Sequence, residues 1–385
     1  MLQIEFVSKD NIFAEDQSTK DILKKGSFGT EEGKKLKLTP EEALYLIDVR
    51  NAECRRKEET ISFNGLASKF WTAKKFIARY LTYKDWRDRG LVIRQPGEEH
   101  SQANKTPIKQ YPKSEIKLPT YSFSGVFFKT DMVSIVEDKE KGKYLYENLW
   151  LGQYGSYKAP ERGQLNKLDI LETTYLLEKG MLRLTNTTQR EVRRIAHSRR
   201  RDFERLYEVY REWRDLGYVI KTGFKFGTHF RVYFPGAKPM TSENKDWVHS
   251  KHVIHVFPKE SRMLISEWAR AIRVAHSVRK TFILAVPGKR AEPKVKPDYI
   301  LFHRKGGEAE NPKTGAPRYA MLSLSEDEYI GGMEFAGAIN EAKRRKLELV
   351  MAIADRETAV TYYKIRQIKL ANSQNEYYEI DWMQP

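Results

Sequence analysis

The stretch FIARYLTYKDWRDRGLVIR, residues 76–94, recurs without gaps as FERLYEVYREWRDLGYVIK, residues 203–221, and nine of the nineteen positions are identical. Both copies place aromatic residues at helical spacing. A glycine, Gly90 or Gly217, follows where a helix would end, and a short β-branched run comes next. Each copy therefore predicts a helix, a glycine cap and a strand. TPEEALYLI and ILETTYLLEKG predict an earlier helix upstream of each copy.

A second repeat lies downstream, where EWARAIRVAHSVRKTFILAV from Glu267 aligns on EFAGAINEAKRRKLELVMAI from Glu334, an offset of 67 residues. The first copy has apolar residues at helical spacing, followed by an apolar strand. Another strand precedes each helix, HVIHVF (252–257) or YAMLSL (319–324), and DYILFH or TYYKIRQI follows each unit. Each copy therefore predicts a strand, a helix and a strand.

Together the repeats predict a mixed α+β fold built from repeated units. We expect a first small domain, a linker rich in proline and lysine, a second small domain, a strand-rich domain and a further copy of the strand-rich domain. In this order their ranges are 1–94, 95–118, 119–222, 223–305 and 310–385. A closing strand, EYYEIDW, ends the chain.

The chain is strongly basic, with a formal net charge of +17 from 69 Lys and Arg against 52 Asp and Glu. This favours a polyanionic partner over a merely well-solvated basic surface, but composition does not separate DNA from RNA. No window approaches the roughly 18 apolar residues of a spanning helix, and the amino terminus lacks a signal-peptide layout, so we expect a cytoplasmic protein. The single cysteine, Cys54, excludes an intrachain disulfide and a zinc site of paired thiolates.

The stretch GFKFGTHFRVYF, residues 223–234, alternates between apolar and polar residues over the length of a strand. Lys225, His229, Arg231 and Tyr233 fall on one face, so a phenol shares that face with two cations and an imidazole. A polar strand face without a chemical role explains this pattern about as well as a catalytic site does.

This strand and the segments around it resemble archaeal tRNA-splicing endonuclease. The segments that carry the resemblance are YEVYREWRDLGYVIKTGFKFGTHFRVY, HSKHVIHVF and RAIRVAHSVRKTFILAV. In the family a catalytic tyrosine ends the FRVY strand, a histidine opens the HSKHVIHV segment and a lysine closes the HSVRK segment. The resemblance places these residues at Tyr233, His249 and Lys280.

The resemblance also implies an architecture. Residues 119–305 are similar to a complete catalytic unit, 1–94 to an amino-terminal domain alone, and 310–385 to the restriction-endonuclease-like carboxy-terminal domain of a structural unit. This arrangement is similar to the three-unit fused type of the family, in which two chains pair as a homodimer with two active sites. The partners implied are precursor tRNA and a second copy of the chain, with no DNA and no membrane.

A metal-independent reaction is what the resemblance implies. Tyr233 would deprotonate the 2′-hydroxyl, His249 would protonate the leaving 5′-oxygen, and Lys280 would stabilise the charged transition state. The products would be a 2′,3′-cyclic phosphate and a 5′-hydroxyl at the bulge-helix-bulge junctions of the intron. No metal or other cofactor is expected. An unperturbed tyrosine has a pKa of about 10, and nearby Lys280, Lys225 or Arg231 would favour its phenolate.

The downstream copy lacks these groups, because Lys280 aligns with Leu347 and His249 with Ala316. We expect no strand like FRVY ahead of this copy, and therefore a catalytically silent unit. In the family a structural unit offers an acidic loop to a basic pocket of a catalytic unit.

The matching loop here is ADRETA, with Asp355 and Glu357. A plain polar hairpin turn explains the same residues equally well before the resemblance is counted. For RNA contacts, the family holds a bulged base between two arginines. Arg273 and Arg304 are the candidates, and Lys225 and Arg231 are further candidate contacts.

Two other functions remain open from the sequence. One is a noncatalytic RNA-binding subunit that positions substrate for a partner enzyme. The other is a metal-dependent nuclease, which would require clustered carboxylates beside a basic residue. Glu326, Asp327 and Glu328 form the densest acidic cluster near that region, but we expect them to cap the following helix.

Overall fold

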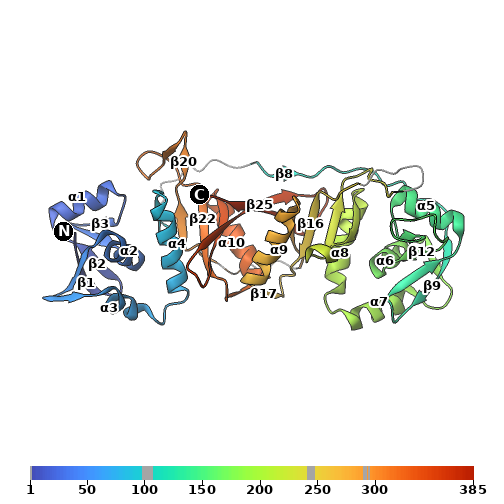
Figure 1. Ribbon diagram of the computed structural model, residues 1–385, viewed down its shortest axis with the longest axis horizontal. Coiled ribbons are helices and arrows are strands. Elements are labelled where there is room, and N and C mark those ends of the chain that lie inside the picture. Colours follow the sequence, from blue (N-terminus) through green and yellow to red (C-terminus); the bar gives the residue numbers. More distant parts are fainter. Residues whose placement is uncertain (1, 98–106, 241–247, 289–292, 294) are drawn as a thin grey trace.

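The computed structural model of the protein describes residues 2–97, 107–240, 248–288, 293 and 295–385. The molecule is elongated: two small domains lie at the ends of the long axis, and a continuous sheet with helices against it lies between them (Figure 1). The mixed α+β fold predicted from the repeats is confirmed. Within the described ranges, no helix is both long and apolar enough to cross a membrane.

The first end domain contains a six-stranded sheet in the order β3-β4-β2-β1-β5-β6. Its elements are β1 (Gln3–Ser8), β2 (Asn11–Ala14), α1 (Gln17–Lys25), β3 (Thr30–Glu32), β4 (Lys35–Leu38), α2 (Pro40–Arg50), β5 (Glu53–Arg56), β6 (Glu59–Ile61), α3 (Phe63–Ala67), η1 (Ser68–Phe70) and α4 (Phe76–Asp88). Helix α2 begins at a capping box, in which Thr39 and Glu42 each accept a hydrogen bond from the other's backbone N–H. This reciprocal bonding fixes the start of the predicted TPEEALYLI helix.

The second end domain has a five-stranded sheet in the order β11-β12-β10-β9-β13. Its elements are β9 (Phe123–Phe128), β10 (Val133–Val136), α5 (Lys139–Leu149), β11 (Gln153–Tyr154), β12 (Asn166–Leu168), α6 (Ile170–Glu178), β13 (Leu182–Leu184), α7 (Gln189–Arg199) and α8 (Phe203–Asp215). Helix α6 also begins at a capping box, formed by Asp169 and Glu172. Gly90 after α4 and Gly217 after α8 have φ of 75° and 89°. Both predicted glycine caps are thus confirmed, in a conformation that a side chain would disfavour.

The central sheet has eleven strands, of which β8 pairs with β25 beside the main path β14-β15-β16-β18-β26-β25-β24-β22-β19-β7. The elements of this region are β7 (Ile93–Arg94), β8 (Lys109–Gln110), β14 (Val219–Thr222), η2 (Phe224–Phe226), β15 (Phe230–Tyr233), β16 (His252–Val256), β17 (Arg262–Leu264), α9 (Ile265–Ser277), β18 (Thr281–Val286), β19 (Tyr299–Leu301), β20 (Arg304–Lys305), β21 (Glu308–Ala309), β22 (Tyr319–Ser325), β23 (Tyr329–Gly331), α10 (Gly332–Arg344), β24 (Glu348–Ala354), β25 (Val360–Lys369) and β26 (Glu376–Met383).

This sheet divides into two equivalent halves that meet where β25 pairs antiparallel with β26. One half runs outward as β26-β18-β16-β15-β14, and the other as β25-β24-β22-β19-β7. Strand directions match: β16 is parallel to β18, as β22 is to β24. In register, His252 faces Thr281 just as Tyr319 faces Glu348, so the 67-residue offset of the downstream repeat also holds in space.

Strand β19, the DYILFH stretch, lies elsewhere than the repeat suggests. As a segment of 223–305 it was expected to follow β18 in its own unit, whereas it pairs with β22 and β7 in the other half. Strand β26 from the chain's end occupies the place beside β18. One unit therefore combines the first end domain with strands β19 to β25. The other combines the second end domain with β14 to β18 and β26.

The carboxy-terminal part of the expected linker is packed against both units. Strand β8 pairs with the end of β25, and the backbone N–H of Ser114 donates to the carbonyl of Leu216. Tyr111 is 5% exposed and its hydroxyl donates to the carboxylate of Glu379 at 2.5 Å. This segment therefore contributes to the core as well as connecting the two units.

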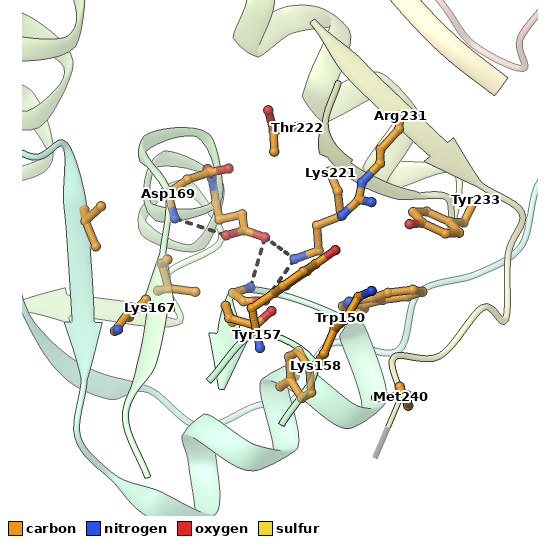
Figure 2. Close-up of a pocket in the computed structure, with 16 residues that line it drawn as sticks. Trp150, Tyr157, Lys158, Lys167, Asp169, Lys221, Thr222, Arg231, Tyr233 and Met240 are labelled. Carbon is orange, nitrogen blue, oxygen red and sulfur yellow. Dashed lines mark hydrogen bonds and ion pairs between the residues drawn. The ribbon is translucent and has the colours of Figure 1, made fainter. Parts of the chain in front are cut away.

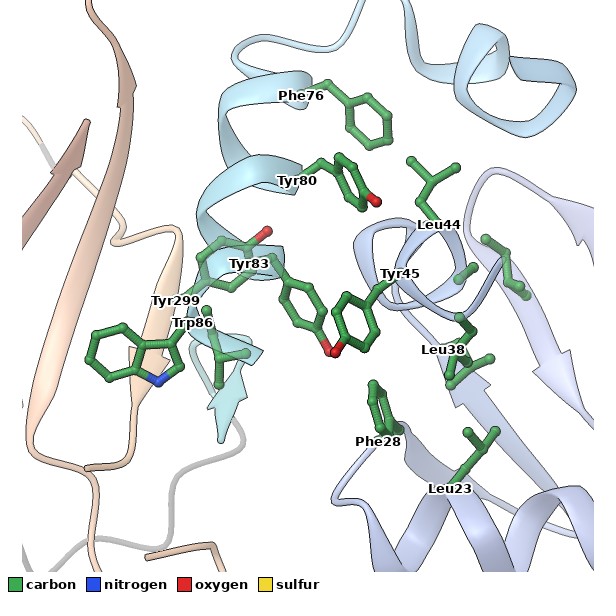
Figure 3. Packing of buried hydrophobic residues seen from close by; sticks show 14 of the residues in the cluster. Leu23, Phe28, Leu38, Leu44, Tyr45, Phe76, Tyr80, Tyr83, Trp86 and Tyr299 are labelled. Carbon is green, nitrogen blue, oxygen red and sulfur yellow. The ribbon is translucent and has the colours of Figure 1, made fainter. Parts of the chain in front are cut away.

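Helices cover both faces of the central sheet, because alternate strand residues point in opposite directions. Helices α4 and α8 pack on one face, and α9 and α10 on the other. Figure 3 shows the aromatic side chains of α4, among them Tyr80 and Tyr83, meeting Tyr45 and Phe28 of the first end domain. This row of rings joins the first end domain to the sheet.

Candidate active site

Tyr233 ends strand β15 and is the central residue of the candidate site. Its neighbours in the sheet are Val219 of β14 and, one residue earlier, His252 of β16 opposite Val232. The side chain is 3% exposed and lines a cavity of about 340 Å³ between the second end domain and the sheet (Figure 2). The Trp150 ring lies beside the Tyr233 ring, with centroids 4.6 Å apart.

A tight turn between α9 and β18 places Lys280 in the same region. After α9, Arg279 adopts a left-handed φ of 54°, and the backbone N–H of Lys280 donates to the carbonyl of Ala275. The ammonium then donates to the carbonyl of Ser250 at 2.6 Å and lies 5.0 Å from the centroid of the Phe226 ring. Burial, with repulsion from Arg231 and Lys251, holds the pKa of Lys280 below its usual value.

The segment that carries His249 lies between the other two residues. Lys251 donates its backbone N–H to the carbonyl of Val232, next to Tyr233, and its own carbonyl accepts from Thr281, next to Lys280. Ser250, which follows His249, accepts the Lys280 ammonium. These backbone links gather the three predicted residues at one end of β15, β16 and β18. The His249 side chain is exposed there.

Burial and a nearby positive charge shift the pKa of Tyr233 in opposite directions. Burial raises the pKa of the Tyr233 hydroxyl, whereas the positive charge of Arg231 lowers it. The Arg231 guanidinium carbon lies 5.7 Å from the centroid of the Tyr233 ring. Lys225 lies further along the same hairpin, with its ammonium 5.4 Å from the centroid of the Tyr157 ring. Of the two cations predicted as RNA contacts, Arg231 lines the cavity, and Lys225 lies over Tyr157, which also lines it.

One wall of the cavity is fixed by buried charges that the sequence analysis did not single out. Lys221 donates to the carboxylate of Glu172 at 2.6 Å, and Glu172 also accepts the backbone N–H of Gly152 (Figure 2). The first end domain repeats this arrangement, with Glu42 accepting from Gly29 and lying 4.0 Å from Arg94. The aligned repeats already indicated that these two cations are equivalent, because Arg94 and Lys221 are the last residues of the two copies. No sequence pattern indicated Trp150, because it lies in the second end domain, outside the strand that carries Tyr233.

The candidate base-clamping arginines lie apart. Arg273 is on the exposed side of α9, where it interacts with Tyr363 of β25. Arg304 is in β20 and donates to the carbonyl of Arg89 in the first end domain at 2.7 Å. Within this one chain the two arginines therefore do not form a pair.

The candidate assembly loop is the turn between β24 and β25. The carboxylate of Asp355 accepts the backbone N–H groups of Glu357 and Ala359, each at 2.9 Å, so this carboxylate also holds the turn together. Arg356 pairs with Asp327 at 2.6 Å, and Glu328 accepts the backbone N–H of Ser325. The described residues include no group of three or more potential metal ligands.

The half of the sheet formed by β25-β24-β22-β19-β7, called the silent half below because we expect no catalysis there, has a counterpart for every residue of the candidate triad. Leu301 faces Tyr319 in the way that Val232 faces His252, so β19 corresponds to the FRVY strand and Phe302 to Tyr233. The expectation that no such strand precedes the downstream copy is therefore wrong, because β19 had been assigned to the other half. Phe302 lacks the hydroxyl, and Ala316 and Leu347 lack the imidazole and the ammonium.

Comparisons with known proteins agree with this description. The family description "tRNA intron endonuclease, catalytic C-terminal domain" matches residues 203–296, and "tRNA intron endonuclease, N-terminal domain" matches residues 4–67. A tRNA-splicing endonuclease of Methanococcoides burtonii is 28% identical over 344 residues, covering 73% of this chain and 94% of the relative.

Shorter relatives match at higher identity. The tRNA-splicing endonuclease of Hyperthermus butylicus is 36% identical over 170 residues, covering 42% of this chain and 88% of the relative. That of Methanopyrus kandleri is 36% identical over 165 residues, covering 42% of this chain and 84% of the relative. The chain therefore belongs to the archaeal tRNA-splicing endonuclease family.

Proposed function

We propose that this protein excises introns from precursor tRNA by metal-independent cleavage at bulge-helix-bulge junctions. The observation that carries the proposal is the meeting of Tyr233, the His249 segment and Lys280 at one end of three neighbouring strands. Family membership supports the substrate class. The net charge of +17 suits a polyanionic substrate.

The reaction is an internal transesterification. The Tyr233 phenolate removes the proton from the 2′-hydroxyl, whose oxygen attacks the adjacent phosphorus. The bond from phosphorus to the 5′-oxygen breaks, and protonated His249 transfers its proton to that oxygen. The products are a 2′,3′-cyclic phosphate and a 5′-hydroxyl. Lys280 stabilises the extra negative charge on the phosphorus-bound oxygens, because its ammonium has N–H donors beyond the one that bonds the Ser250 carbonyl.

The phenol needs help to act as a base, because burial raises its pKa. Arg231 provides opposing charge, and its guanidinium lies next to the ring. A fixed cation in a partly desolvated site acts more strongly than the same cation in water. Arg231 therefore supports the phenolate form, in addition to the RNA contact expected of it from the sequence.

Pairing of two chains follows from the count of sites. One chain has a single candidate triad, because its other half has Phe302, Ala316 and Leu347 at the corresponding positions. Excision of an intron requires two cuts. Two chains related by a two-fold axis would present one triad to each junction. We propose that Asp355 and Glu357 of one chain dock on a basic pocket of the other.

The test uses purified protein and precursor tRNA in the presence of EDTA. Cleavage at both junctions, with 2′,3′-cyclic phosphate ends, is the expected result, and light scattering should give about twice 45.1 kDa. Loss of cleavage in EDTA that added Mg²⁺ restores would instead indicate a metal-dependent nuclease. Binding without cleavage would indicate a noncatalytic RNA-binding subunit. Full excision by a species of monomer mass would contradict the pairing.

A further inference from the structure

An exposed tryptophan marks the junction between η1 and α4 in the first end domain. Trp71 is 83% exposed, although the residues on either side of it in the fold are in the core: Phe70 and Phe76 are 7% and 5% exposed. Their rings stack with centroids 4.9 Å apart. The indole therefore projects from a packed base, beside a shallow depression of about 500 Å³ that also includes Ile77.

The charge around this ring is positive. The segment from Phe63 to Ile77 contains three lysines and no acidic residue. Lys69 is exposed, and the Lys74 side chain is 77% exposed with Glu334 4.0 Å away. Lys75 instead lies within 4 Å of Asp298 and Glu328, which anchors the junction to the central domain. Two lysines therefore remain at the surface beside the exposed indole.

The equivalent junction in the other unit, between α7 and α8, has the positive charge but not the tryptophan. At the 127-residue offset of the first repeat, Ser198 near the end of α7 takes the place of Trp71. Arg199, the last residue of α7, and Arg200 and Arg201 after it are all exposed, and Arg200 pairs with Asp202. The two junctions thus share positive charge and little else. Figure 1 places α3 and α7, the helices that lead into them, in the two end domains along the same edge of the molecule.

We propose that Trp71, with Lys69 and Lys74 beside it, is a binding site for unpaired nucleotides of the RNA, with the indole stacking on a base. The proposal rests on the proposed function, because it assumes an RNA substrate. Aromatic side chains among cations are how proteins bind single-stranded nucleic acid without reading its sequence. Exposure of an indole in water is unfavourable, and a stacked base would remove that penalty while the lysines pair with neighbouring phosphates.

An RNA fits this site better than a protein does. A protein interface of ordinary strength needs a broad apolar surface with few charges at its centre. Here one exposed ring lies in the sequence between two exposed lysines, and the matching segment in the other unit, residues 190–204, has the same net charge of +3. A second copy of the chain or another protein would be detected as a different outcome of the test.

The test measures RNA affinity in a background that does not cut, Lys280→Ala, so that binding is read even if the proposed cleavage is absent. In this background Trp71→Ala should weaken binding of precursor tRNA by about 5- to 100-fold, and Trp71→Phe should restore most of the loss because a phenyl ring still stacks. Phe128→Ala is the matched control, an aromatic residue 48% exposed on β9 of the other end domain. It should bind as the background does.

Fluorescence identifies the type of RNA bound. Single-stranded oligonucleotides of roughly ten residues should quench a tryptophan signal that is absent from Trp71→Phe, and a duplex of the same length should not. Affinity of Trp71→Ala within twofold of the background would overturn the proposal. So would equal quenching by the duplex, or a change in the mass of Trp71→Ala in light scattering, since the latter would make this surface a protein interface.

Discussion

The two halves of the central sheet have the same strand order, directions and register, yet only one has the tyrosine, histidine and lysine of the proposed triad. In the silent half, Phe302 and Leu347 are 2% and 6% exposed and belong to the apolar interior. In the catalytic half, Tyr233 and Lys280 are 3% and 9% exposed. The backbone therefore creates the same enclosed position twice, and function depends on whether a polar side chain is placed there.

This comparison also shows what a buried functional group requires. The Lys280 ammonium needs an acceptor, which the Ser250 carbonyl provides, and burial still lowers its pKa. Leu347 needs only apolar neighbours and has them in α10 and β24. Leu347 therefore avoids the cost of removing a charged group from water.

The largest expected effect comes from giving the catalytic half the residues of the silent half. Tyr233→Phe, His249→Ala and Lys280→Leu should each lower the single-turnover rate by at least about a hundredfold, because each removes a proton transfer or a charge from the transition state. RNA affinity should change little. Rates measured with excess enzyme over labelled precursor tRNA check this.

The silent half contains the matched controls for these variants. Phe302→Tyr and Leu347→Ala alter the corresponding positions and should leave the single-turnover rate unchanged. Leu347→Ala should lower the free energy of unfolding by about 2 to 4 kcal/mol, because it leaves a cavity in the core. A near-normal rate for any one triad variant would remove that residue from the mechanism.

The next effect concerns the loop between β24 and β25, which only the silent half is expected to use. Asp355→Lys would also break the turn, because this carboxylate accepts two backbone N–H groups. Glu357→Lys is therefore the sharper variant. It should lower cleavage at least about tenfold, and light scattering should show dissociation toward the monomer mass.

Arg356→Gln is the control for this variant, because Arg356 pairs with Asp327 within the same chain. It should preserve the dimer. A Glu357→Lys protein with the dimer mass and a normal rate would show that this loop has no part in assembly.

Much of this architecture could be predicted from the repeats, because aromatic spacing and glycine caps are local features that recur with the same register. The two offsets found in sequence, 127 and 67 residues, also hold in the sheet. Ile93 and Ile220 occupy equivalent places, facing Leu301 and Val232, and Tyr319 faces Glu348 as His252 faces Thr281. Strand exchange could not be predicted. An apolar strand such as β19 carries no local mark of its partner, and the partner is decided by which neighbours complete the core.

The candidate site shows the same division. The motifs predict Tyr233, His249 and Lys280 as a group, since each ends or opens an element that the sequence makes recognisable. Trp150 was missed because it ends a helix of another domain and reaches Tyr233 only through the packing of the two domains. Tyr111 was missed for a similar reason, because it lies in a segment with the composition of a linker.

A smaller effect is expected from Arg231, which has no exact counterpart in the silent half, where the apolar Ile300 takes its place in β19. Arg231→Gln should slow cleavage at neutral pH by about three- to tenfold. Arg231 lowers the pKa of Tyr233, so its removal raises that pKa and leaves less phenolate at a given pH. The rising limb of the rate against pH should therefore move to higher pH.

Measurement of single-turnover rates across the pH range at saturating RNA separates this role from a binding role. A lower rate at every pH with an unchanged midpoint would mean that Arg231 acts only by holding RNA. Lys225→Gln is the comparison, because that ammonium lies over the Tyr157 ring and is not among the charges that shift the Tyr233 pKa.

The smallest expected effect is on stability in acid, and it also belongs to the catalytic half. Burial lowers the pKa of His229 to about 3, helped by neighbouring His255 and Arg200 and opposed by Asp202. Burial lowers the pKa of His255 and of His252 to about 4. In the silent half Leu322 and Tyr319 stand at the positions of His255 and His252.

The sign follows from proton counting. An unfolded imidazole binds a proton below about pH 6.5, whereas these folded ones stay neutral until about pH 4, so acid favours the unfolded chain across that window. The contribution of these imidazoles to the free energy of unfolding is full above pH 6.5 and falls as the pH drops toward 4, by up to about 1.4 kcal/mol per imidazole per pH unit.

Carboxylates titrate in the same window, so the wild-type curve alone does not isolate the imidazoles. His255→Leu copies the silent half and removes one of them. Between pH 7 and 5 its urea-unfolding free energy should fall by about 1 to 2 kcal/mol less than that of the wild type. Parallel curves for the two proteins would show that His255 does not cause the acid sensitivity.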